Sequence, residues 1–274
     1  MERLNFFFDV DGTLLPFGKG LPESALKAIL DAKAKGHRIF VSTGRSPLEM
    51  DPRLSPIPFD GGVYAGGCTV IYQGETVYRR RCTEKERETL LSYFEKEGIL
   101  SLIQCDEGTY ASAESFEYFK ELLIKANGNV IDVPGLVITD HLPVTAEISK
   151  IVCVSPSGEV DKIRKDLEGP FHVIDNTLGI DNSIMCEICL PSSDKGSGIR
   201  NLMAYLKEDM KTAVGVGDGA NDVEMIEYCG LGIAMGNASE CAKEAADYVT
   251  TSVESDGIKN AIDYALGVYL GNNH

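Results

Sequence analysis

Short apolar runs alternate with amphipathic stretches at both ends of this chain, and that rhythm constrains its fold more than any other feature. Residues 6–10 are apolar apart from Asp9, as expected of a short buried strand. A helix is predicted next, opened by Pro22 and ended by Gly36, followed by a second strand over 38–41. Because two parallel strands joined by a helix form a right-handed crossover, this end of the chain predicts a parallel sheet.

The same alternation returns near the C-terminus. A helix is predicted from the i, i+3, i+4, i+7 spacing of Ile199, Leu202, Met203 and Leu206. Further strands and helices are predicted, in chain order, over residues 212–216, 222–228, 231–234 and 248–249. The two ends of the chain therefore predict one doubly wound, Rossmann-like α/β core with a parallel sheet.

Between these ends the parallel rhythm breaks. A period-two pattern around a Gln73-Gly74 turn predicts a hairpin over 69–78, and Thr83 with Glu86 forms a capping box that opens a helix. More strands and helices are predicted over 99–104, 114–125, 148–154, 159–167 and 171–174. We therefore expect residues 1–82 and 186–274 to form the core, and residues 83–185 to form an inserted α+β domain.

Composition limits the class of protein. The chain has 274 residues, with 42 Asp and Glu against 26 Lys and Arg, for a formal net charge of −16. Because nucleic-acid binding needs a basic face and the longest basic run is residues 79–81, we expect no nucleic-acid partner. No apolar run reaches the roughly 18 residues of a membrane span, and the first residues do not resemble a signal peptide. We therefore expect a cytoplasmic protein with no membrane partner.

The eight cysteines fit the same compartment. Without a secretory signal they indicate reduced thiols rather than a disulfide framework. Cys186 and Cys189 form the only CxxC pattern, but a strand would point them to opposite faces, and no second pair completes a zinc site. We interpret them as buried structural cysteines rather than as a metal or redox site.

Four polar clusters follow predicted strands, where an open parallel sheet binds its ligands. They are residues 9–13, 42–45, 195 and 217–222. In the first cluster, Asp9 and Asp11 stand two apart, so an extended backbone would project both carboxylates to one side. Their repulsion would raise the pKa of one and leave the other ionised, as a nucleophile and its acid/base partner require. The alternative is a turn built on Asp-Gly chemistry.

Asp218 and Asp222 bracket Asn221 in a glycine-rich turn. Such oxygen ligands suit Mg²⁺, which commonly takes one or two carboxylates together with substrate phosphate oxygens. Two other interpretations compete. Residues 215–220 fit a dinucleotide-binding pattern, although that pattern would set Asp218 against a pyrophosphate, and a calcium loop would need a different spacing of Gly and Glu.

Lys195 and residues 43–45 supply donors for an anion. Lys195, at a strand-to-helix turn, can neutralise a phosphoryl oxygen and a nucleophilic carboxylate together, or else lie solvated on the surface. Thr43 and the backbone amide of Gly44 can donate to an anion where the next segment begins. Arg45 can contact the substrate or form a salt bridge.

Together and in this order, the four clusters resemble those of the haloacid dehalogenase superfamily, specifically its Cof-type phosphatases with a large inserted cap. The motifs are Asp-x-Asp-Gly-Thr at 9–13, Thr-Gly-Arg at 43–45, Lys-Gly at 195–196 and Gly-Asp-Gly-x-Asn-Asp at 217–222. The resemblance spans nearly the whole chain. It implies that residues 83–185 are the cap that shapes substrate specificity.

The resemblance also implies roles for individual residues. Asp9 would be the nucleophile, Asp11 the acid/base and Lys195 the charge neutraliser. A Mg²⁺ ion would be held by Asp9, the backbone carbonyl of Asp11 and Asp218, with Asp222 supporting. The phosphate-binding set would be Thr43, Gly44, Arg45, Lys195 and Asn221.

One position departs from the family pattern. The family often has Asn-Gly-Ala after the third strand, whereas this chain has Gly66 at the Asn position. A side-chain contact near the cap hinge is then missing. Within the cap, six residues either contact the substrate or only form loops, and the sequence does not distinguish these two roles. They are Asp106, Glu107, Tyr110, Asp140, His141 and Asn182.

The sequence thus predicts a Mg²⁺-dependent phosphomonoester phosphatase that acts through an aspartyl phosphate on a small phosphorylated metabolite such as a sugar phosphate. The alternative enzyme is a phosphohexomutase with a similar core and cap. The alternative that is not an enzyme is a catalytically silent regulatory module that binds phosphate. Such a module would not need both Asp9 and Asp11. We expect a small-molecule phosphate ester as the partner, and a monomer or weak homo-oligomer.

Overall fold

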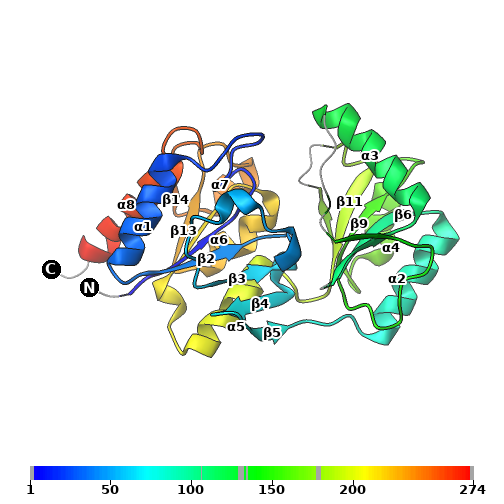
Figure 1. Cartoon of the computed structure of the whole chain (residues 1–274), viewed down its shortest axis with the longest axis horizontal. Helices are drawn as coiled ribbons and strands as arrows, with labels where there is room; N and C mark the ends of the chain where they lie inside the picture. The colour runs from blue at the N-terminus through cyan, green and yellow to red at the C-terminus, as the bar shows by residue number, and fades with distance from the viewer. Residues whose placement is uncertain (1–2, 106, 129–132, 134, 177–179, 272–274) are drawn as a thin grey trace. The chain divides into compact units, whose positions relative to one another are not determined.

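The computed structural model describes residues 3–105, 107–128, 133, 135–176 and 180–271, which fall into two compact units (Figure 1). The first unit comprises Met1–Gly44, Met50–Arg79 and Asp194–His274, and the second comprises Arg45–Glu49 and Arg80–Ser193. The units therefore divide the chain at 79/80 and 193/194, rather than at the expected 82/83 and 185/186. The second unit also takes a five-residue segment, Arg45–Glu49, that the sequence places in the core.

A mixed sheet forms the centre of the first unit. Among the described residues it has eight strands, in the order β14-β13-β12-β1-β2-β3-β4-β5. Strands β14 to β3 of that order are parallel, and β4 and β5 extend the sheet as the predicted antiparallel hairpin. Their bounds are β1 Asn5–Phe8, β2 Arg38–Ser42, β3 Gly61–Tyr64, β4 Thr69–Tyr72, β5 Glu75–Arg79, β12 Ala213–Gly217, β13 Leu231–Ala234 and β14 Tyr248–Val249. The predicted doubly wound α/β fold is confirmed.

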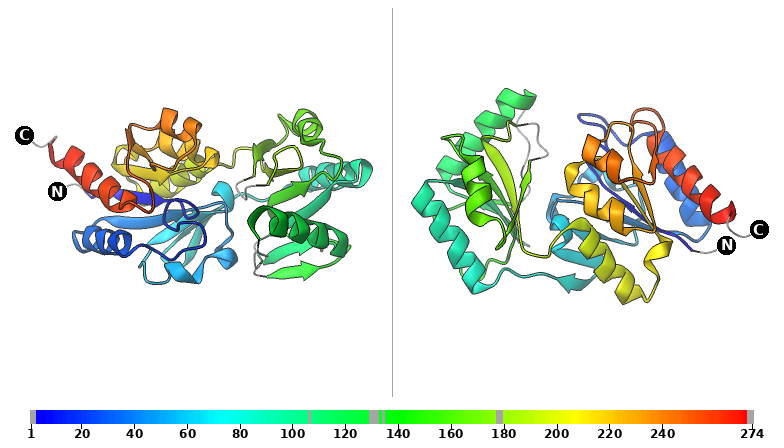
Figure 2. Two further views of the ribbon diagram at one scale, coloured as in Figure 1. Left: turned by 90° about the horizontal axis from the view of Figure 1, so that it is seen from above. Right: turned by 180° about the vertical axis from the view of Figure 1, so that it is seen from behind.

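Helices cover both faces of this sheet (Figures 1 and 2). On one face α1 (Glu23–Ala34) and α8 (Gly257–Gly271) lie side by side over Phe6 and Phe8. On the other face α5 (Lys195–Leu206) and α6 (Val223–Tyr228) pack on Phe7. The three consecutive phenylalanines thus contribute to two apolar cores, one on each face of the sheet, because neighbouring residues of a strand point to opposite faces. The remaining helix of this unit is α7 (Glu240–Ala245).

The second unit has its own sheet. Its six described strands run in the order β10-β11-β9-β6-β7-β8, and all neighbours are antiparallel except β7 with β8. The strands are β6 Leu100–Cys105, β7 Gly108–Ala111, β8 Leu136–Ile138, β9 Ile148–Val154, β10 His172–Asp175 and β11 Met185–Cys189, and the helices are α2 Glu84–Glu97, α3 Ala113–Asn127 and α4 Val160–Leu167. The predicted capping box opens α2, since Thr83 accepts a bond from the Glu86 amide and Glu86 accepts one from the Thr83 amide.

Short 3-10 helices connect several of these elements: η1 Pro47–Glu49, η2 Pro52–Leu54, η3 Ala65–Gly67, η4 Met210–Thr212 and η5 Ala220–Asp222. Cys186 and Cys189 both lie in β11 as buried free thiols, consistent with a structural role. Throughout the part of the chain that the structure describes, no helix combines the length and apolar character that crossing a membrane requires.

Candidate active site

Charged side chains from three loops meet at the carboxyl edge of the first unit's sheet. Asp9 follows β1, Asp222 follows β12, and Lys195 opens α5. The Lys195 Nζ donates to Asp9 Oδ1 and to Asp222 Oδ1, each at 2.6 Å, and all three side chains are buried. The solvated surface position considered for Lys195 is therefore wrong. An ammonium group is instead held between two carboxylates contributed by separate loops.

Asp222 also shapes the turn that carries Asp218. Its second oxygen, Oδ2, accepts hydrogen bonds from the backbone amides of Asp218 (3.0 Å) and Gly219 (2.9 Å). With Lys195 on Oδ1, both oxygens of Asp222 have partners. Asp222 therefore stabilises the turn that carries Asp218.

Gly12 and Thr13, which follow Asp11, also position the Asp218 side chain. Thr13 Oγ1 donates to Asp218 Oδ1 at 2.6 Å. Gly12 has φ +88°, and a Cβ at this position would lie 2.2 Å from Asp218 Oδ2. Only glycine permits this conformation at so close an approach. The Gly and Thr of the Asp-x-Asp-Gly-Thr motif therefore fix a carboxylate more than 200 residues away in sequence.

The electrostatics of this cluster favour a cation. Burial and then Asp222 raise the pKa of Asp9 well above its ordinary value, and they raise the pKa of Asp218 to about 7. Burial alone would lower the pKa of Lys195, but Asp222 and Asp9 hold it above its ordinary value. Three carboxylates thus share one ammonium, and the remaining negative charge has little solvent to stabilise it.

A divalent metal fits this donor set. Asp9, Asp218 and Asp222 each offer a carboxylate oxygen, and these atoms lie within 4.8 Å of one another. The donors are all oxygens, which suit hard cations such as Mg²⁺. Because both oxygens of Asp222 already accept hydrogen bonds, Asp9 and Asp218 are the carboxylates best able to bind an ion directly.

Thr43 is held at the end of β2 by its backbone. Its amide donates to the Val63 carbonyl (2.8 Å), and its carbonyl accepts from the Gly66 amide (3.1 Å). Gly66 has φ +59° and ψ +34°, a left-handed conformation that Gly and Asn both adopt readily. The exchange of Asn for Gly at this position therefore preserves the backbone while it removes a side chain. Arg45 belongs to the second unit, where its Nη1 donates to the Glu49 carbonyl at 3.1 Å.

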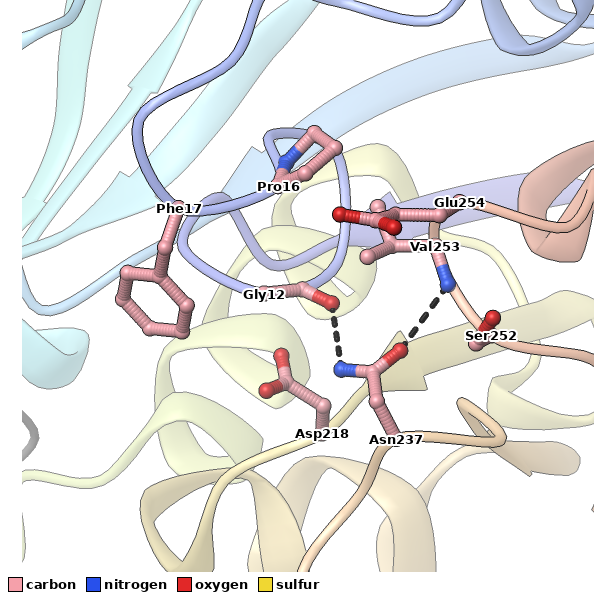
Figure 3. Close-up of a pocket in the computed structure, with 8 residues that line it drawn as sticks. All are labelled: Gly12, Pro16, Phe17, Asp218, Asn237, Ser252, Val253 and Glu254. Atoms are coloured by element: carbon pink, nitrogen blue, oxygen red, sulfur yellow. Dashed lines mark hydrogen bonds between the residues drawn. The ribbon is translucent and has the colours of Figure 1, made fainter.

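A pocket of about 380 Å³ lies beside Asp218 (Figure 3). Asn237 ties two of its walls together, since its Nδ2 donates to the Gly12 carbonyl and its Oδ1 accepts from the Val253 amide, both at 2.9 Å. Phe17 stands on the rim with 72% of its surface exposed. The lining residues are Gly12, Pro16, Phe17, Asp218, Asn237, Ser252, Val253 and Glu254. Sequence reasoning missed Asn237, although its place shortly after β13 is a signal of the same kind as the four clusters.

The candidates in the second unit mostly bond within their own loops. Asn182 accepts from Asn176 Nδ2 at 2.7 Å, and the His141 amide donates to Thr139 Oγ1 at 3.2 Å. The Tyr110 hydroxyl donates to Glu107 at 3.3 Å, and Asp140 is exposed. Asp106 lies outside the described residues. These contacts favour loop roles for Asn182 and His141.

Comparison with known proteins adds independent findings. A family model for haloacid dehalogenase-like hydrolases matches residues 6–262. The Bacillus subtilis protein YkrA is 28% identical over 269 residues, which cover 96% of this chain and 97% of that protein. From the same organism, 5-amino-6-(5-phospho-D-ribitylamino)uracil phosphatase YitU is 26% identical over 262 residues, with coverages of 91% and 93%. The solved structure of a Geobacillus kaustophilus protein has a TM-score of 0.83 at 24% identity and covers 97% of this chain and 99% of that one.

Proposed function

The chain belongs to the haloacid dehalogenase-like hydrolases, as a phosphoric monoester hydrolase of the Cof type, and we propose that it cleaves a small sugar phosphate through an aspartyl phosphate with Mg²⁺. One observation carries the mechanistic part of this proposal. Lys195 is buried between Asp9 and Asp222, with Asp218 beside them, at the ligand-binding edge of the sheet. This arrangement matches what phosphoryl transfer requires, namely a positioned nucleophile and compensation of charge.

Asp9 and Asp218 would hold the metal, together with the backbone carbonyl of Asp11, and Asp222 would support them. When bound there, Mg²⁺ supplies positive charge to the phosphoryl oxygens and balances the excess of carboxylates. The raised pKa values of Asp9 and Asp218 support this assignment, because a cation would stabilise the ionised forms that burial opposes.

The chain's own residues would carry the chemical steps. Lys195 orients the Asp9 carboxylate, one oxygen of which would attack phosphorus while the bond from phosphorus to the leaving oxygen breaks. Asp11 would donate a proton to the leaving oxygen and later take one from the water that hydrolyses the aspartyl phosphate. Thr43, the Gly44 amide, Arg45 and Asn221 would bind the phosphoryl oxygens.

A sugar or polyol phosphate is the substrate class that we favour. The relative YitU is named for a phosphorylated ribityl compound, whose ester carries a polyol chain. Membership of a hydrolase family favours transfer to water over the mutase alternative. Release of inorganic phosphate from hexose phosphates would support hydrolysis, whereas conversion of 1-phosphate to 6-phosphate without release would support the mutase.

Asp9→Asn tests the nucleophile. We expect it to lower phosphate release from a panel of sugar, polyol and nucleoside phosphates by roughly 10⁴-fold or more in the presence of Mg²⁺. Asn preserves the size of Asp and can still accept from Lys195, so the variant should fold. The matched control is Asp31→Asn, an exposed residue of α1 paired with Lys27, which should turn over normally. Undiminished turnover by Asp9→Asn would contradict the mechanism.

A further inference from the structure

A five-residue segment that begins with the predicted phosphate contact Arg45 belongs to the second unit. Arg45–Glu49 belongs to that unit, whereas Gly44 before it and Met50 after it belong to the first. Met50 packs against the apolar core under α1 and α8. Because consecutive Cα atoms are only 3.8 Å apart, a segment this short constrains the residues on either side of it. Whatever holds residues 45–49 therefore also acts on the backbone of Thr43 and Gly44.

Glu49 is the residue that holds the segment. Its side chain is buried, with 9% of the residue exposed. One carboxylate oxygen accepts from Gln104 Nε2 (3.0 Å) and Thr109 Oγ1 (3.1 Å), and the other accepts from Gln104 Nε2 (2.9 Å) and the Ser46 amide (2.8 Å). Gln104 on β6 and Thr109 on β7 are direct cross-strand partners. Since an unpaired buried carboxylate is costly, these bonds fix Glu49 to two strands.

Gln104 and Thr109 belong to a row of cross-strand neighbours, and the next residue in this row forms a buried ion pair. Lys150 on β9 is the cross-strand partner of Gln104, and its Nζ donates to Glu187 on β11 at 2.8 Å. Burial lowers the pKa of Lys150, but Glu187 and, more weakly, Glu49 raise it by more. The ammonium therefore stays charged and attracts Glu49 as well. The row supplies Glu49 with hydrogen-bond donors and a nearby positive charge.

Within the segment, two further groups depend on Glu49. The Ser46 amide donates to its carboxylate, and Arg45 Nη1 donates to its carbonyl oxygen at 3.1 Å. The turn of η1 brings these groups together over three residues. Glu49 thus orients the guanidinium of Arg45 and fixes the backbone that directly follows Gly44.

We propose that Glu49 is a positioning residue for the phosphate-binding loop 43–45, because it anchors the segment 45–49 to β6 and β7. The inference rests on the proposed function, since it takes residues 43–45 to contact the phosphoryl group. Glu49 lies outside all four sequence clusters, and it reaches the phosphate only through the residues that it holds.

Glu49→Gln in the full chain tests the proposal. Gln removes the negative charge and replaces one acceptor oxygen with an NH₂ group, so the Gln104 amide and the Ser46 amide can no longer both keep their present bonds without rearrangement. We expect kcat/KM for sugar phosphates to fall about 10-fold, because small misplacements of binding groups are costly to catalysis. The inhibition constant of inorganic phosphate should rise by a similar factor, since loop 43–45 supplies three of the proposed contacts to this small anion.

A second substitution should rescue the first. Glu49→Gln combined with Gln104→Glu exchanges donor and acceptor, so the bond between these positions can form again. We expect the double variant to recover most of the kcat/KM and of the phosphate inhibition. The control is Glu187→Gln, which breaks the ion pair with Lys150 in the same sheet but leaves the bonds of Glu49 in place. It should lower the Tm and leave phosphate inhibition unchanged.

Three results would overturn the proposal: wild-type phosphate inhibition in Glu49→Gln, no rescue by the double variant, or equal weakening of phosphate inhibition in Glu187→Gln. Failure of the proposed function is distinguishable from these, because the wild-type chain would then release no phosphate from any ester. In that case amide exchange still tests the anchor. Exchange at residues 43–46 should be faster in Glu49→Gln than in the wild type, and unchanged exchange would overturn the anchoring role.

Discussion

His37 is a buried imidazole whose ionisation opposes folding. Only 4% of the residue is exposed, its Nδ1 accepts from the Leu4 amide at 3.0 Å, and the ring meets Phe6 edge-on at 5.9 Å between centroids. Burial first, and then Lys35 and Arg3, lower its pKa below the ordinary value. A proton on Nδ1 would also point at the N–H of Leu4. The native fold therefore stabilises the neutral imidazole.

Acid should destabilise the first unit through this residue. The unfolded chain protonates His37 near pH 6.5, whereas the folded chain does so only at lower pH, so stability falls as the pH drops below about 6.5. In His37→Asn the Asn oxygen can replace Nδ1 as acceptor and does not titrate. We expect this variant to lose less Tm than the wild type between about pH 7.5 and about pH 5.5. The control His141→Asn changes an exposed loop residue, and an equal loss of Tm in His37→Asn and wild type would contradict the account.

At this scale, sequence predicted the residues that belong to motifs and missed those that do not. Asp9, Asp218 and Asp222 could be expected to meet, because all follow strands of one parallel sheet. Lys195 instead follows β11 of the other sheet, so only its motif in the family resemblance predicted its place. Asn237 and Glu49 carry no comparable pattern. Their bonds run to Gly12, Val253, Gln104 and Thr109, and only the folded chain brings these groups together.

Helix α5 sets the position of Lys195 through its cap and its packing. Asp194 accepts from the Ser197 amide at 2.6 Å, and Ser197 Oγ accepts from the Asp194 amide at 3.0 Å, which closes a reciprocal capping box. One turn along, Gly198 lies against β3 and η3. A Cβ at this position would lie 2.4 Å from Val63 Cγ1 and 2.9 Å from Gly67 Cα. The distance between α5 and the sheet therefore depends on a missing methyl group.

Gly198→Ala should push α5 away from β3 and displace Lys195. We expect a loss of about 1–3 kcal/mol in the free energy of unfolding and about a 10-fold lower kcat/KM. Gly267→Ala in α8 is the matched control, because its Cβ meets no atom within 4 Å and the residue is exposed. There the same substitution should stabilise the chain by roughly 1 kcal/mol through helix propensity alone. Urea unfolding and steady-state kinetics measure both, and equal effects at the two glycines would contradict the packing argument.

The elements that sequence predicted well are those with strong local chemistry. The capping box at Thr83 and the Gln73-Gly74 turn specify α2 and the β4–β5 hairpin without help from distant residues. The sequence did not predict β7 or β8, which have four and three residues. β11 was assigned to the core, yet it pairs with β9 and β10. The sequence of one strand does not determine which strands it pairs with in a sheet.

At the scale of the whole molecule, the chain carries a net charge of −16, and the buried charged groups of its two units differ in how they are balanced. In the first unit, Asp9 and Asp222 are buried against a single ammonium group and Asp218 beside them is half-buried, so solvent and salt screen their repulsion poorly. In the second unit, the buried Lys150 faces Glu187 in a balanced pair. Repulsion among the carboxylates therefore destabilises the first unit, and a divalent cation bound there would reduce that repulsion.

Mg²⁺ should accordingly stabilise the first unit selectively. A ligand that binds only the folded state adds RT ln(1 + [L]/Kd), about 2.7 kcal/mol when the ion is 100-fold above its Kd. Amide exchange should slow in β1 and β12 on addition of Mg²⁺ and stay unchanged in β9 and β11. The effect should weaken below about pH 7, because Asp218 then holds a proton with which the ion must compete. Asp218→Asn should abolish the protection and Asp31→Asn should keep it, whereas equal protection of both units would mean that the ion does not act through the buried carboxylate cluster.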